Sequence, residues 1–336
     1  MPTIDTNEIG SGGGRDYSTI NAWWAAECDG VDVVSGDIIA HGRLHNDSAF
    51  STGGLNLDGA TVDSTRYPHI SVAGGDEWDP AAGTGLEVQS GGSATNIFEL
   101  TSSYTRITGG IYLNYDSSSS GDMIVFSGAT GYHLDRLFIA FTGYGAQSWN
   151  AFFGGYYTSW ASCQFTNIII DANTGGGSLG MGLQGESAGG AASSTLIANI
   201  IVYGRGNLTT AFEDTGDAVV RNCYSIDTTN FEGGTSTDID YCLSTSGTVT
   251  GSNSTASITE ADQFEDPANG DFALKSGSDG LDHGENLTSD FTTDYDGATR
   301  PSTGDWDAGV YAAAAAVAAG TPYQNPIRAF AHLLVR

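Results

Sequence analysis

The chain has 336 residues, a net charge of −29 and a single lysine, Lys275. Such a field repels phosphate backbones and anionic membranes, so the sequence predicts neither a nucleic-acid nor a membrane partner. Hydrophobic residues make up 39% of the chain and there are 48 glycines, which excludes a disordered chain and favours many short strands joined by tight turns.

The first 30 residues are predicted to be a lead-in followed by a capping helix. The glycine-rich run Gly10–Gly14 is expected to be flexible. Asp16–Ala26 then has the pattern of an amphipathic helix, with Ser18 as its N-cap. A repeat array leaves its first repeat open to water, and a helix across that end covers it. Residues 1–5 have neither a basic nor an apolar leader, so we expect synthesis in the cytoplasm without a signal peptide.

Five segments in the middle of the chain share one pattern: an apolar residue, two further positions and three mostly apolar residues. They begin at Leu134, Phe165, Ile197, Val220 and Ile239. Between 19 and 32 residues separate the start of one copy from the next, which is enough for three short strands and three turns. We therefore predict an all-β fold, a right-handed parallel β-helix solenoid over residues 31–311.

Two columns of this predicted stack have a direct physical meaning. The third position holds Asn167, Asn199 and Asn222, whose side chains could form an asparagine ladder along the axis; a chance run of turn asparagines is the alternative. Cys223 and Cys242 share the fourth position, about 4.8 Å apart on adjacent coils. A disulfide is possible there, but two buried free thiols are favoured.

The fifth position should point outward, yet it is apolar in every copy. It holds Phe138, Ile169, Ile201, Tyr224 and Leu243. A continuous apolar stripe on an outer face is unusual in a monomer, so something should cover it. Long turn insertions, the C-terminal tail and neighbouring subunits are the candidates. The stripe is the main reason to expect a homo-oligomer, with a trimer favoured.

The end of the chain departs from the repeat. Residues 312–336 combine an Ala/Gly linker with a short apolar tail that is expected to be helical. Its apolar residues recur at helical spacing and are candidates for docking on a partner, such as another virion protein: Ile327, Phe330, Leu333 and Leu334. Docking on the solenoid itself is the alternative.

Both ends of the repeat region resemble a known family. The run Gly14–Ile20 is similar to the family's opening, and Asp63–Tyr67 continues it. Phe264–Leu274 looks like its closing coil, and Trp306–Tyr311 is a degenerate copy of the segment that usually follows. On these stretches the chain resembles the pectate-lyase-like right-handed β-helix proteins of phage and bacterial genomes, including tailspike-like proteins. The resemblance implies the fold more strongly than the function, because this fold hosts lyases, hydrolases, adhesins and spikes.

Residues for catalysis are sparse. Lyase chemistry in the family implies an Arg or Lys base with calcium, and no such cluster is recognisable. Asp171 and Asp227 follow their strands at nearly matching offsets and are the best candidate pair of carboxylates for glycoside hydrolysis. Capping of turns is the alternative role for both. Asp294 and Asp296 could hold calcium, but a turn stabilised by their side chains is favoured, so no cofactor or metal is predicted.

Binding is better supported than catalysis. Tyr156, Tyr157 and Trp160 precede the Phe165 strand and could form an aromatic platform for neutral sugars, unless they cover the apolar stripe. The sequence favours a phage virion surface protein of the spike, fibre or decoration type that binds a glycan. A polysaccharide lyase or glycoside hydrolase and a bacterial surface adhesin are the alternatives.

Overall fold

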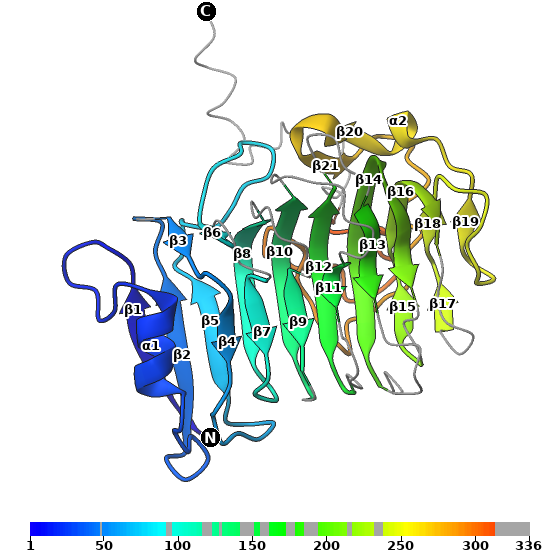
Figure 1. Cartoon of the computed structure of the whole chain (residues 1–336). Coiled ribbons are helices and arrows are strands. Elements are labelled where there is room, and N and C mark those ends of the chain that lie inside the picture. Colours follow the sequence, from blue (N-terminus) through cyan, green and yellow to red (C-terminus); the bar gives the residue numbers. More distant parts are fainter. Residues whose placement is uncertain are drawn as a thin grey trace, which may run out of the picture.

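The computed structural model is mostly β, and its main element is one parallel sheet of 19 strands. The structure describes residues 1–47, 49–91, 96–115, 123–127, 130–141, 151–154, 161–172, 179–184, 194–213, 217–231 and 238–312. Within these ranges strands from successive repeats pair side by side in the same direction, as Figure 1 shows. The all-β prediction with parallel pairing is confirmed at this level.

The pairings form three ladders. The first contains β1 (Thr3–Ile9), β2 (Ile38–Leu44), β5 (Pro68–Val72), β8 (Arg106–Tyr115), β10 (His133–Phe141), β12 (Gln164–Asp171), β14 (Leu196–Glu213), β15 (Val219–Arg221) and β17 (Asp238–Asp240). The predicted repeats pair here in the predicted register, with Leu134 beside Phe165 and Phe165 beside Ile197.

The second ladder begins with β3 (Phe50–Ser51) and β6 (Glu87–Gln89), continues through the second halves of β8, β10, β12 and the middle of β14, and ends with β16 (Tyr224–Asn230), β18 (Leu243–Ser244) and β19 (Thr255–Ala256). The third contains β4 (Leu55–Leu57), β7 (Phe98–Leu100), β9 (Ile124–Phe126), β11 (Ala151–Gly154), β13 (Leu179–Gln184) and the ends of β14 and β16.

The chain bends between the first and second ladders at the third repeat position. Five successive copies place a non-glycine residue there in the left-handed region, with φ between 53° and 58°: Arg136, Asn167, Asn199, Asn222 and Tyr241. Asparagine tolerates this conformation because its short polar side chain bonds locally. The side-chain amides of Asn199 and Asn167 are in contact at 3.2 Å, the stacked arrangement that an asparagine ladder requires.

One apolar cluster unites side chains from the three ladders. Inward positions of all three ladders contribute to it, among them Leu134, Phe165 and Ile197. Cys223 and Cys242 lie in the same core as free thiols, as predicted, and burial raises the pKa of Cys223 far above its ordinary value. Cys223 is therefore not a reactive thiolate at neutral pH.

The N-terminal region contains a strand that the sequence analysis did not predict. Strand β1 pairs with β2, so the parallel sheet begins at the third residue rather than after residue 30. Helix α1 (Ile20–Glu27) follows, and its N-cap is Thr19, which accepts from the Ala22 amide. The prediction of Ser18 as the cap was wrong by one residue. Trp23 and Trp24 are buried against the first strands, as expected of a helix that covers the end of the stack.

The glycine-rich run was expected to be flexible, but it is fixed by Asp47. The Asp47 carboxylate accepts from the Ser11 and Gly12 amides at 2.7 and 3.0 Å, and pairs with Arg15 at 2.9 Å. Small residues are required here because a Cβ on Gly10 would lie 2.3 Å from Asp47 Oδ1. The glycines therefore serve close packing rather than flexibility.

Gly10→Ala is expected to lower the free energy of unfolding by about 1–3 kcal/mol, because Asp47 must leave its hydrogen bonds to make room. Gly13→Ala is the matched control: a Cβ there meets nothing within 4 Å, so the variant should be neutral or slightly stabilising. Urea unfolding of both variants measures the difference. Equal stabilities would contradict the assigned role of Asp47.

A C-terminal cover, residues 257–312, packs on the outer face of the second ladder. It contains α2 (Glu260–Gln263), β20 (Phe264–Asp266), the short 3-10 helix η1 (Pro267–Asn269) and β21 (Asp271–Leu274), followed by irregular chain. β20 and β21 pair antiparallel and lie above the ends of β14 and β16 in Figure 1. The cover thus packs the end of the described chain against strands that lie earlier in the sequence.

This cover buries the apolar stripe. The stripe residues pair across neighbouring strands as predicted, and each is 6% exposed or less. Phe264 packs edge-on against Tyr224, with 5.0 Å between ring centroids, and the cluster also contains Phe272, Val310 and Tyr311. The chain itself therefore covers the stripe, and the stripe is no longer a reason to expect a trimer.

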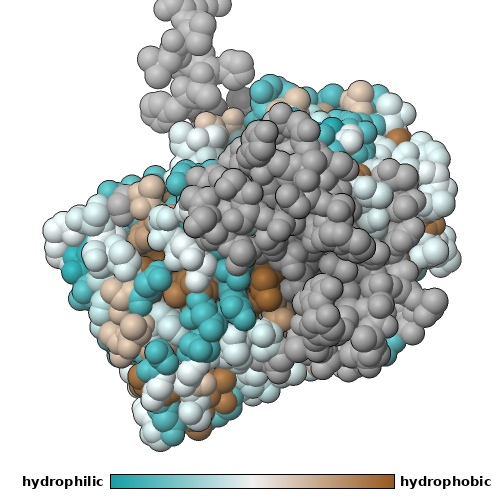
Figure 2. All heavy atoms as spheres, viewed as in Figure 1, coloured by the Kyte–Doolittle hydropathy of each residue, from teal (hydrophilic) through white to brown (hydrophobic). Residues whose placement is uncertain are grey.

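The described part of the molecular surface has no comparable apolar band on the face drawn in Figure 2. Hydrophilic and weakly polar residues cover most of the coloured surface there, and hydrophobic residues form small separate groups among them. Among the described residues, the large hydrophobic side chains that remain exposed are Met1 and Ile4. Burial by the cover thus removes the main apolar surface that the strands alone would present.

Candidate functional site

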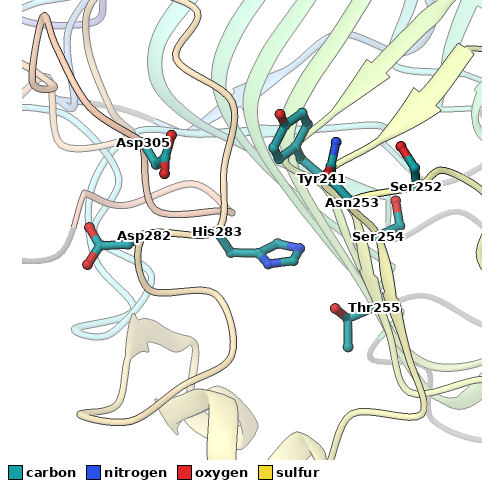
Figure 3. A pocket seen from close by; sticks show the side chains of 8 residues that line it. All are labelled: Tyr241, Ser252, Asn253, Ser254, Thr255, Asp282, His283 and Asp305. Carbon is teal, nitrogen blue, oxygen red and sulfur yellow. The ribbon is translucent and has the colours of Figure 1, made fainter.

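A polar pocket of about 360 Å³ lies between the last strands of the sheet and the C-terminal cover (Figure 3). One wall comes from residues at and before β19, the other from the irregular part of the cover. The lining residues are Tyr241, Ser252, Asn253, Ser254, Thr255, Asp282, His283 and Asp305. Its volume is that of an ordinary small-ligand site, but its lining is far more polar than most.

The wall on the strand side is held by Asp240. Its carboxylate accepts from the Asn253 amide and side chain at 2.7 and 2.8 Å, and from the Tyr241 amide at 3.0 Å. Burial raises the pKa of Asp240, but these hydrogen bonds outweigh it and hold the pKa below its usual value. Ser254 is fixed too, since its hydroxyl accepts from the Cys242 amide at 3.1 Å. This wall is therefore preorganised.

The opposite wall carries an imidazole and two carboxylates. Figure 3 shows the ring of His283 directed across the pocket toward the chain that carries Ser254 and Thr255. Its Nε2 atom is buried without a hydrogen-bond partner, and burial lowers the pKa of His283 below its ordinary value. The ring is therefore neutral at pH 7. The Asp282 amide donates to Asp307 at 2.9 Å, which fixes the backbone beside this ring.

The pocket can bind a polyhydroxylated ligand. Hydroxyls, an amide and carboxylates supply both donors and acceptors, and Tyr241 adds an aromatic ring. No Arg or Lys lines it, so a strongly anionic ligand does not fit. The sequence analysis missed this site because its residues come from four separate stretches, 241, 252–255, 282–283 and 305, without spacing that marks a site.

Asp171 was a candidate catalytic carboxylate, and the structure places it in an ion pair. It is 4% exposed, and Arg205 donates to its two oxygens at 2.5 and 2.8 Å. Arg205 also donates to the Ala268 carbonyl at 3.1 Å, which joins this pair to the C-terminal cover. Burial raises the pKa of Asp171 despite the opposing effect of Arg205. This carboxylate is engaged in holding the cover to β12.

Asp227 lies two strands away from Asp171. The register runs from Asp171 to Tyr203 and on to Ile226, the residue before Asp227, so the two backbones are about 10 Å apart. Asp227 has a φ of 52° at a bend, and its amide donates to the Thr245 hydroxyl at 2.8 Å. We assign no catalytic role to this pair.

A second polar feature runs along the outer face of the first ladder. His41, His69, Arg106 and His133 occupy one column on four successive strands. The His41 and His69 rings stack with centroids 4.7 Å apart. His41 Nε2 bonds the Ser71 hydroxyl at 2.7 Å, and His69 Nε2 bonds the Thr108 hydroxyl at 2.9 Å. The column concentrates basic groups in a strongly acidic chain.

Acid should destabilise the fold through His69. Burial, with His41, Arg106 and His133 nearby, lowers the pKa of His69 to about 3. In the unfolded chain this imidazole takes up a proton near pH 6.5. The contribution of neutral His69 to the free energy of unfolding is therefore fully present above pH 6.5 and falls by roughly 1.4 kcal/mol per pH unit as the pH drops towards 3. His69→Gln should make the pH dependence shallower in urea unfolding between pH 7 and 4.5, while His41, His133 and His283 maintain the rest of it. Parallel curves for both proteins would contradict the assignment.

Two sets of predicted residues lie outside the described ranges. They are the glycan-binding candidates Tyr156, Tyr157 and Trp160 and the partner-docking candidates Ile327, Phe330, Leu333 and Leu334. Asp294 is described, and its carboxylate accepts from the Ala298 and Ala312 amides at 2.8 and 3.1 Å, which is the favoured turn-stabilising role. The described residues contain no group of three or more side chains suited to hold a metal ion.

Comparisons with known proteins add no relative. No protein-family model matches the chain, and no curated protein matches it significantly. Among the described residues, no helix is both long and apolar enough to cross a membrane.

Proposed function

We propose that the three ladders close into a right-handed parallel β-helix solenoid that serves as an attachment protein of the virion spike, fibre or decoration type. The three ladders, each advancing by one strand per repeat, support the solenoid. The resemblance of both ends of the repeat region to tailspike-like proteins supports the location on a virion. We propose that the protein binds a glycan on the surface of a host cell.

The polar pocket is the observation that carries the glycan-binding role. Its hydroxyl, amide and carboxylate groups match the donors and acceptors of a sugar, and its strand-side wall is fixed before any ligand arrives. The acidic lining, with Asp282 and Asp305, favours neutral or amino sugars over acidic ones.

A microarray of bacterial surface polysaccharides, followed by calorimetry on the glycans that bind, tests this role. The double variant Asp282→Ala, Asp305→Ala should weaken binding at least about tenfold, because charged hydrogen-bonding groups contribute about 1.5–3 kcal/mol each. Asp217→Ala, which removes an exposed carboxylate away from the pocket, should leave the affinity unchanged. Binding that is equally strong in the double variant would place the glycan site elsewhere.

A hydrolase is the second candidate, because the pocket holds an imidazole with a free buried nitrogen together with two aspartates. Carboxylates in such a pocket could serve as acid and base. A reducing-end assay on each glycan that binds distinguishes the two functions. Release of reducing ends that stops in Asp305→Ala would favour the hydrolase, and binding without release would favour attachment.

We also propose that the chain forms a homotrimer and that residues 312–336 bind another virion protein. With the stripe buried by the C-terminal cover, a trimer would need a different surface. Light scattering of the full chain measures the assembly directly: a monomer has a mass of 34.8 kDa, and a trimer three times that.

A further inference from the structure

One arginine in the described part of the chain has no polar partner for its side chain. Its other basic side chains pair with carboxylates or donate to backbone carbonyls: Arg15, Arg43, Arg66, Arg136, Arg205, Arg221, Lys275 and Arg300. Arg106 does neither. Its one recorded interaction is a cation–π contact with Tyr67, 3.8 Å from the guanidinium carbon to the ring centroid. In a chain with 40 acidic residues, an unpaired arginine is not explained by a lack of carboxylates.

The contact with Tyr67 leaves the hydrogen-bonding edge of Arg106 unused. A guanidinium that stacks on a ring uses its face, while its five N–H groups point outward in the plane and match the oxygens of an anion in pairs. Stacking also fixes the orientation of the plane before any ligand arrives. Arg106 is therefore preorganised for an oxyanion.

The groups beside Arg106 are compatible with an anion. His69 and His133 flank it in register on the neighbouring strands, and neither is a carboxylate. Thr108, two residues along the same strand, is bonded to His69. Asp135, the nearest acid on β10, is already engaged by the Thr166 hydroxyl and the Asn167 amide at 2.7 and 2.9 Å. Its other oxygen lies 3.3 Å from Arg136 Nε, so this carboxylate already has a counter-charge of its own.

Because Arg106 is partly buried, the absence of a polar partner for its guanidinium costs free energy. Burial lowers the pKa of Arg106, which indicates that the cation has lost part of its hydration without gaining a counter-charge. An arginine in this state is stabilised by any oxyanion that reaches it, because a charge-assisted bidentate contact is about twice as strong as a neutral one.

We propose that Arg106, stacked on Tyr67 and flanked by His69 and His133, is a binding site for a single small oxyanion: a sulfate, phosphate or carboxylate group. The net charge of −29 repels polyanions, so the ligand is a free ion or a lone anionic substituent on an otherwise neutral molecule. The site lies on the first ladder and is independent of the polar pocket and of the function proposed for it.

Calorimetric titration with sodium sulfate at pH 7, against sodium chloride at equal ionic strength, tests the site. The full chain should show saturable sulfate binding that Arg106→Gln weakens at least tenfold. Arg106→Lys should retain part of it, because the charge stays and the bidentate geometry is lost. Arg66→Gln removes an arginine that is half-buried and already paired with Asp37 and Asp63, so it is the matched control and should bind like the unmodified protein.

Two sugars identify the source of the anion. Glucuronate and galactose 6-sulfate present a carboxylate and a sulfate on a neutral ring, and galactose is the uncharged control. Binding of either sugar, with loss in Arg106→Gln, would support a substituent on a glycan, while binding of inorganic sulfate alone would support a free-ion site. Absence of saturable binding for all anions, or equal binding in Arg106→Gln, would overturn the proposal. The Asp282→Ala, Asp305→Ala variant should bind sulfate normally, which separates this test from that of the pocket.

Discussion

Arg300→Met is expected to lower the free energy of unfolding by about 3–5 kcal/mol. Arg300 is 1% exposed, and its guanidinium donates to the Asp307 and Gly309 carbonyls at 3.1 and 2.8 Å. It also lies over the Trp306 ring, 5.1 Å from the centroid. Burial lowers the pKa of Arg300 to about 10, so the side chain is still charged at neutral pH. Methionine fills part of the volume but leaves both carbonyls buried without a donor.

Urea unfolding at pH 7 measures this loss, and Arg66→Met is the control because the Arg66 side chain is 29% exposed and pairs with the exposed Asp37. A loss confined to Arg300→Met would support the role of this side chain as the internal support of the C-terminal cover. If Arg300→Met unfolded at the same urea concentration as the control variant, the cover would not depend on the bonds made by Arg300.

Asn199→Ala is expected to cost roughly 2–4 kcal/mol. The residue has a φ of 55°, which alanine adopts poorly, and its side chain is fully buried in the asparagine column. One orientation of its amide donates to Asn167. In the other orientation the amide oxygen accepts from Arg300 Nη2 and Nε, both 3.2 Å away. Alanine therefore loses a buried hydrogen bond and strains the backbone at the same time.

Asn199→Gly separates these two effects, because glycine adopts the positive φ freely. We expect Asn199→Gly to be more stable than Asn199→Ala, the reverse of the usual order within a strand. Thermal unfolding of the two variants ranks them. A glycine variant that is no more stable than the alanine variant would mean that the left-handed bend costs little at this position.

Local repetition explains why much of the sheet was predictable. The apolar pattern that begins at Leu134, Phe165 and Ile197 contains both the strand alternation and the register, because like residues pair on adjacent strands. The asparagine at the third position also marked a special place. The backbone bends there with a φ in the left-handed region. A sequence pattern indicates such a bend only through the residue types that tolerate it.

Long-range returns of the chain were not predictable. The outward position of Ile201 was read correctly, but nothing local indicates that Val310, more than 100 residues later, joins the same buried cluster. The polar pocket has the same origin, because Asn253 and His283 meet only when the cover folds back. Arg106 could not be predicted either, because its lack of a polar partner is evident only after the partners of the other basic residues are known.

Hydrogen exchange of the full chain tests most directly the central claim that the chain's own C-terminal cover closes the outer face. Amides of the cover are bonded both to the sheet and within the cover: Gly309 donates to Asn222 O, Tyr295 to Val310 O and Trp306 to Gly284 O, at 2.8 Å each. We predict that peptides from residues 284–311 are protected to nearly the same degree as those of β12 and β14. Exchange of these peptides at the rate of an unfolded chain, while β12 and β14 stay protected, would contradict the account.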